Sequence, residues 1–193
     1  MIPDLSASAL VQRVRSYYPA GLVPDDPEYK GSVEAQRLMQ FLANAQKDMS
    51  AWKSFVQHVR KALPECLLWD STLLVHEPCY RLRVSLPRQD PNLEQSQEVV
   101  CLLSLLAPAY VLYASYSLYT GPTAEQWTRY SPLPPAFQDC EARLAGLVEA
   151  TFNVTRLPNE VLFTPVPDLR PLSGNFSLGK ARLIDLLFTE DRW

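Results

Sequence analysis

The chain is poor in histidine and glycine, with two and six among 193 residues, and it has no run of basic residues. Two histidines exclude a metal site built from several imidazoles and leave little room for a Cys/His or Ser/His nucleophile pair. The net charge of -3 gives no electrostatic reason to bind nucleic acid or an anionic membrane surface. We find no catalytic, metal-binding or cofactor motif, and we expect no nucleic-acid partner.

Cysteine is also sparse, and no C-x-x-C pair occurs. The four cysteines are Cys66, Cys79, Cys101 and Cys140. Most of them lie in apolar stretches, where a reduced cysteine behaves as a small hydrophobic residue, so we expect free buried thiols. The first residues, MIPDLSASALVQRVR, do not combine a basic segment with an unbroken apolar one. We therefore expect a cytoplasmic chain.

Charge is missing altogether between Glu98 and Glu125, and residues 99–119 are almost entirely apolar or aromatic. A run of this length fits either one membrane-spanning helix or two consecutive buried strands. Pro108 stands at its midpoint, β-branched and aromatic residues outnumber good helix formers, and neither flank carries a Lys/Arg cluster. These features favour two strands and a protein without a membrane span.

The first third of the chain has helical periodicity. A short amphipathic helix is predicted around Leu10, Val14 and Tyr17, and Asp26-Pro27 is typical of the start of a longer helical region. An apolar stripe with steps of three and four residues continues to Pro64. Its members are Leu38, Leu42, Ala45, Met49, Trp52, Val56, Val59 and Leu63. The region is either one helix or two in line, because Ser50 can begin a second.

After Pro64 the period changes to that of strands, predicted at 67–75 and 80–86, and the uncharged run supplies two more. The third strand is apolar on both faces and should be central. Residues 120–135 contain several prolines and are predicted to form a long exposed loop. A helix at 136–152, a strand at 161–164 and a helix at 178–188 follow. The sequence thus predicts one α+β domain over 1–193, with N-terminal helices on a four-stranded antiparallel meander and helix-strand-helix at the C-terminus.

Candidate partner-binding residues fall in two places. The predicted loop displays Trp127, Arg129 and Tyr130, which are residue types enriched in protein interfaces. The other candidates lie on predicted strands and are Tyr113, Tyr119, Arg81 and Arg83. If they project from one sheet face, they form an aromatic and guanidinium surface suited to a protein partner; alternatively, the protein's own helices cover that face.

Two functional hypotheses follow. The first is a non-enzymatic protein-binding domain, most specifically a bacterial immunity-type protein that neutralises a cationic toxin by stoichiometric binding. The alternative is an enzyme whose site is assembled around His76, Glu77 and Cys79, near Asp70, with the Trp127 segment converging on the same pocket. Size, acidic balance and missing catalytic motifs favour the first hypothesis.

Overall fold

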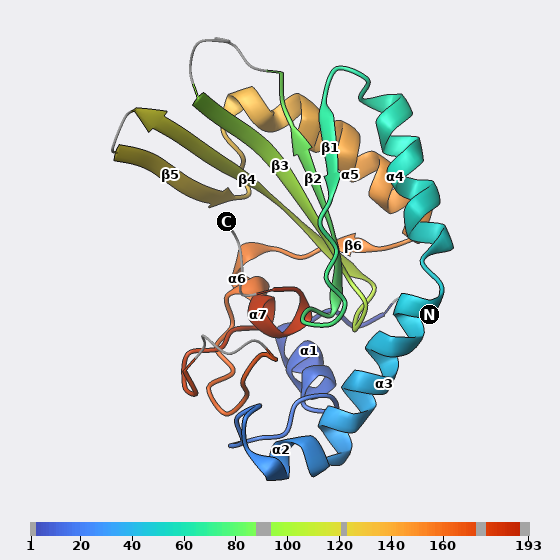
Figure 1. Ribbon diagram of the computed structural model, residues 1–193, viewed down its shortest axis with the longest axis vertical. Coiled ribbons are helices and arrows are strands. Elements are labelled where there is room, and N and C mark those ends of the chain that lie inside the picture. Colours follow the sequence, from blue (N-terminus) through green and yellow to red (C-terminus); the bar gives the residue numbers. More distant parts are fainter. Residues whose placement is uncertain (1–2, 88–93, 121–122, 173–176, 190–193) are drawn as a thin grey trace.

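The computed structural model describes residues 3–87, 94–120, 123–172 and 177–189 (Figure 1). The predicted α+β class is confirmed, because helices and a six-stranded sheet are both present. The strands are β1 (Leu67–Asp70), β2 (Cys79–Ser85), β3 (Glu94–Ser104), β4 (Ala109–Thr120), β5 (Thr123–Tyr130) and β6 (Thr155–Arg156). The helices are α1 (Ala7–Val14), α2 (Pro27–Gly31), α3 (Val33–Lys47), α4 (Ser50–Ala62), the 3-10 helix η1 (Pro135–Phe137), α5 (Gln138–Phe152), α6 (Asn159–Leu162) and α7 (Leu183–Leu187).

The sheet is an antiparallel meander in the order β1-β2-β3-β4-β5, and β6 adds a short parallel pairing to β4. The uncharged run forms most of β3 and β4, as predicted, with the turn at Pro108 between them. β3 is central, and its residues from Val99 to Ser104 are buried on both faces. Within the described ranges, no helix is long and apolar enough to cross a membrane.

Two strand predictions were wrong. The segment predicted as a long loop contains β5, which pairs residue for residue with β4, and its prolines lie before and after the strand in the sequence and none lies within it. The meander therefore has five strands. The strand predicted at 161–164 is absent: its first two residues are the end of helix α6, which begins after Pro158, and the Pro158 carbonyl accepts the N–H of Leu162. Beyond Asp70 the chain leaves the sheet, so β1 is shorter than the predicted 67–75.

The helical region before the sheet is broken twice. Asp26 precedes α2, but its carboxylate accepts the Val23 N–H instead of capping the helix. Ser32 then caps α3 by accepting the Ala35 N–H at 3.2 Å, so Ser32 is the single residue between α2 and α3. Asp48 separates α3 from α4, which confirms two helices in line at this point.

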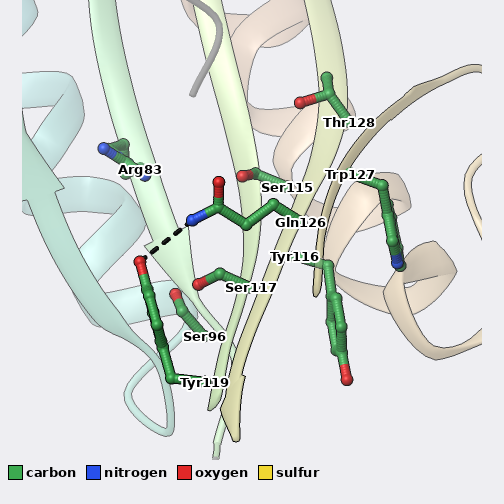
Figure 2. Close-up of a pocket in the computed structure, with 9 residues that line it drawn as sticks. All are labelled: Arg83, Ser96, Ser115, Tyr116, Ser117, Tyr119, Gln126, Trp127 and Thr128. Carbon is green, nitrogen blue, oxygen red and sulfur yellow. Dashed lines mark hydrogen bonds between the residues drawn. The ribbon is translucent and has the colours of Figure 1, made fainter. Parts of the chain in front are cut away.

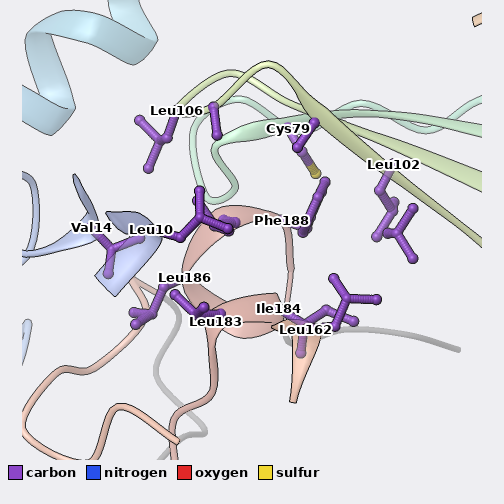
Figure 3. Close-up of a cluster of buried hydrophobic side chains, with 14 of the residues drawn as sticks. Leu10, Val14, Cys79, Leu102, Leu106, Leu162, Leu183, Ile184, Leu186 and Phe188 are labelled. Atoms are coloured by element: carbon purple, nitrogen blue, oxygen red, sulfur yellow. The ribbon is translucent and has the colours of Figure 1, made fainter. Parts of the chain in front are cut away.

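The break after α3 divides the apolar stripe between two cores on opposite sheet faces. Trp52 and Val59 of α4 pack with α5 on one face, where Leu112 of β4 is fully buried. Leu38 and Leu42 of α3 join the other core instead. In that second core α1 and α7 pack against the sheet (Figure 3). Its members labelled in Figure 3 are Leu10, Val14, Cys79, Leu102, Leu106, Leu162, Leu183, Ile184, Leu186 and Phe188.

The second core covers only part of its sheet face. In Figure 1, α1, α6 and α7 lie against one end of the strands, whereas α4 and α5 extend along the other face. Towards the opposite end, side chains on the face of the second core change from buried and apolar to polar and accessible. Within the described residues, no helix covers this end of the sheet face, and this region is the candidate site.

Candidate functional site: an uncovered sheet face

The uncovered region follows from alternation along the central strands. On β3, Val100 and Leu102 belong to the second core, and Ser96 and Glu98 continue the same face beyond it. On β4, buried Tyr113 is followed on that face by residues that are half-buried or exposed. We call this region the open face. It comprises Leu67, Trp69, Arg83, Ser85, Glu94, Ser96, Glu98, Ser115, Ser117, Tyr119, Gln126 and Thr128.

Two shallow hollows of about 260 and 290 Å³ lie on the open face, and Arg83 lines both. The first hollow is rich in hydroxyl groups from β3, β4 and β5. Figure 2 shows the side chains of Ser115 and Ser117 beside Gln126, whose amide donates to the Tyr119 hydroxyl at 3.1 Å. The second hollow lies towards β1 and is bordered by Trp69. The face therefore offers hydrogen-bonding groups between two aromatic side chains.

An ion pair stands between the two hollows. Arg83 Nε and Nη2 both lie 2.6 Å from Glu98 Oε2, and Ser85 Oγ donates to Glu98 Oε1 at 3.1 Å. Both charged side chains are partly shielded from solvent, which favours a fixed orientation over a mobile surface pair. The guanidinium plane is therefore held in place between β2 and β3.

Large apolar side chains at both ends of the open face are accessible to solvent. Leu67 is 78% exposed and Trp69 is 70% exposed on edge strand β1, while Tyr119 near the end of β4 is 45% exposed. Scattered exposed apolar residues are ordinary, but here three of them share one sheet face with polar groups between them. Exposed Trp and Tyr on a rigid strand are typical anchors for a protein partner.

The predicted partner-binding residues do not form one surface. Arg83 and Tyr119 lie on the open face. Arg81 and Tyr113 share its side of the sheet but are buried under the second core, and burial raises the pKa of Tyr113. Tyr130 is half-buried, with its ring 5.4 Å from that of Tyr113. The two alternatives for this face, an aromatic and guanidinium surface or a face covered by the protein's own helices, therefore each hold in part. The face is covered at one end of the strands and open at the other.

Trp127 and Arg129 project to the opposite face of the sheet, because they alternate with Gln126 on β5. The Trp127 indole stacks on the Tyr116 ring at 5.0 Å and meets the Phe137 ring edge-on at 5.9 Å. Figure 2 shows Trp127 and Tyr116 side by side, pointing away from the hydroxyl groups. This cluster anchors β5 to the first core.

Of the residues of the enzymatic alternative, Glu77 and Cys79 are buried, and His76 lines one hollow together with Glu77. Glu77 Oε1 accepts from Arg81 Nη2 at 2.6 Å and from Thr189 Oγ1 at 2.6 Å, which ties the end of α7 to β2. Cys79 is fully buried, and burial raises the pKa of its thiol well above the ordinary value. His76 is exposed and lines hollows other than the one bordered by Trp127. The Trp127 segment therefore does not converge on His76.

The sequence analysis missed Leu67 and Trp69 as surface anchors. A signal was present, because Leu67 and Trp69 alternate with Leu68 and Asp70, and only the second pair faces α4. Within residues 3–87, 94–120, 123–172 and 177–189, no group of three or more His, Cys, Asp or Glu is arranged to hold a metal ion.

Comparison with known proteins yields no relative: no family model, curated protein or solved structure matches this chain. Its function must be argued from the open face.

Proposed function

We propose that this chain is a non-enzymatic protein-binding domain, and that the open face is its interface. The observation that carries the proposal is the incomplete cover of one sheet face, which leaves Leu67, Trp69 and Tyr119 exposed among polar side chains. A rigid sheet presents these anchors without the loss of conformational entropy that a loop would suffer on binding.

The composition of the open face supports a protein partner. It contains Trp, Tyr and Arg, which interfaces favour, together with four serines and two glutamates, which most interfaces use less, although serine is common in antibody binding surfaces. Its serine hydroxyls can donate and accept hydrogen bonds at a small cost in side-chain entropy. Such a face combines apolar anchors with adaptable polar contacts.

The dimensions also favour a macromolecule over a small ligand. Five strands spaced about 4.8 Å apart span roughly 20 Å, which matches a strand or loop of a folded partner. The two hollows, at about 260 and 290 Å³, fall below the roughly 300–1,000 Å³ of typical small-molecule sites.

In its most specific form, the proposal is a bacterial immunity-type protein that neutralises a toxin in the cytoplasm by stoichiometric binding. The charge pattern supports a cationic partner: Glu94 and Glu98 outnumber Arg83 on the open face, and the whole chain carries -3. Glu94 is exposed, whereas Glu98 is engaged with Arg83.

Site-specific photocrosslinking in the native cell tests the interface. A benzophenone amino acid placed at Trp69 or Tyr119 should capture one and the same protein, because both positions border the open face. The matched control positions are Val33 and Met39, which are exposed apolar residues of α3. Capture of the partner from α3 but not from the open face would refute the proposed interface.

A further inference from the structure

β5 is an edge strand with features that invite pairing to a second chain. Among the described strands it pairs with β4 alone, and its eight residues match β4 without a bulge (Figure 1). The part described between Thr123 and Tyr130 contains no proline or lysine, two residues with which proteins usually protect an edge. Its backbone is therefore a regular template for another strand.

Two opposite charges on β5 lie symmetrically about Trp127. Glu125 and Arg129 flank Trp127 at a spacing of two residues, and all three project to the same sheet face. Both charged side chains are exposed, and neither makes an ion pair within the described part of the chain. The Arg129 guanidinium lies over the Trp127 ring, 5.3 Å from the ring centroid.

We infer that two copies of this chain associate through their β5 edges, antiparallel and in a register centred on Trp127. In this register Glu125 stands opposite the second copy's Arg129, and Arg129 stands opposite the second copy's Glu125. Trp127 stands opposite its own counterpart on the two-fold axis. Opposite charges and aromatic pairs directly across two strands are both stabilising arrangements.

The competing symmetric registers are worse. A register centred on Glu125 or Arg129 places like charges opposite each other, which is destabilising. Registers centred on positions 126 or 128 place Trp127 opposite one charged residue and leave the other charge without its complement. Side chains alternate between the two faces along a strand, so residues paired directly across the two strands must project to the same face. In a symmetric pairing this condition holds when the two-fold axis passes through a residue and not between two residues. Charge complementarity therefore selects Trp127.

The inference goes beyond the proposed function and does not depend on it. A two-fold axis normal to the sheet keeps equivalent faces on the same side, so the two open faces would lie next to each other. The meanders of both copies would form one continuous sheet, and each β5 would cease to be an edge.

Charge exchange on β5 tests the inference through sedimentation velocity of the full chain over a concentration series. The wild type should be a dimer that dissociates on dilution. E125R or R129E each replaces two attractive cross-strand pairs with two repulsive ones, which should raise the dimer dissociation constant roughly tenfold to hundredfold. The double variant E125R/R129E restores opposite charges and should return close to the wild-type constant. K53E, on the exposed side of α4, is the matched control and should leave the constant unchanged.

Circular dichroism establishes that each variant is folded before its association is compared. A wild type that stays monomeric at every concentration would overturn the inference. A dimer that ignores both single reversals, or a double variant that remains as weak as the single ones, would overturn it as well.

Discussion

Replacing Asp70 with alanine is expected to destabilise the fold and to loosen the strand that carries Trp69. The Trp52 side chain of α4 is 1% exposed, and its Nε1–H donates to Asp70 Oδ2 at 3.0 Å. Its ring also stacks on that of Tyr80 at 4.8 Å. The other Asp70 oxygen accepts from the Thr72 hydroxyl at 2.6 Å, where the chain turns out of the sheet. Asp70 therefore joins edge strand β1 to α4.

The expected loss is about 2–3 kcal/mol of unfolding free energy. An indole N–H left without its acceptor in a buried position costs roughly 1–3 kcal/mol. The hydrogen bonds from Thr72 contribute less, because that end of Asp70 is accessible and water replaces the carboxylate. For a chain of this size, the loss corresponds to a fall in Tm of roughly 5–10 °C. Since β1 has four residues and pairs, among the described strands, with β2 alone, we also expect weaker partner binding through Trp69.

Urea unfolding followed by circular dichroism measures the effect for D70A, W52F and the double variant. The cycle should show a coupling free energy of about 1–2 kcal/mol between the two side chains, since either substitution alone removes their hydrogen bond. D25A, an exposed carboxylate in the segment before α2, is the control. Additive losses in the double variant, or a D70A protein as stable as D25A, would refute the reasoning.

Three further predictions concern acid, thiols and the core. Hydrogen bonds from the Ser50 hydroxyl and backbone N–H lower the pKa of Asp48 below 3.8. The contribution of Asp48 to stability is therefore present above pH 3.8 and is lost as the pH falls through the folded-state pKa. An NMR titration of Asp48 checks the direction of the shift, and D48N should remove this pH-dependent contribution to stability. Burial raises the pKa of Cys101 and Cys140 to about 12. At neutral pH a thiol reagent such as Ellman's should therefore label these two cysteines only after denaturation. Rapid labelling of Cys101 or Cys140 in the native protein would contradict their burial. L102A, which empties a fully buried position of the second core, should cost about 2–5 kcal/mol in urea unfolding, and a neutral effect would contradict the packing.

Much of the sheet is predictable because strand signals in this chain are strong where burial is complete. Residues 99–119 lack charge and contain Pro108 near their centre, which is enough to place the buried part of β3, β4 and the turn between them, whereas residues 94–98 of β3 were interpreted as part of a connection. β5 was missed because prolines dominate the surrounding segment and because its own residues do not alternate between apolar and polar side chains. Its strand conformation depends on pairing with β4, and such a tertiary contact is not visible in local propensity.

The open face was only half predictable. Alternation placed Tyr119 on the same side as Tyr113, and Arg83 on the same side as Arg81; the strand registers show that both pairs share one side of the sheet. What the pattern could not show is where the cover by α1 and α7 ends, since that boundary depends on contacts between distant segments. Trp69 was missed because residues 67–75 were interpreted as one buried strand.

The most direct test of the central claim is the affinity of the crosslinked partner for a variant in which the open face has lost its anchors. W69S/Y119S should bind the partner at least about a hundredfold more weakly, because exposed aromatic anchors at interfaces contribute roughly 2 kcal/mol or more each. V33S/M39S removes two similarly exposed apolar side chains from α3 and should bind like the wild type. Equal affinity for wild type and W69S/Y119S, with both proteins folded, would contradict the account.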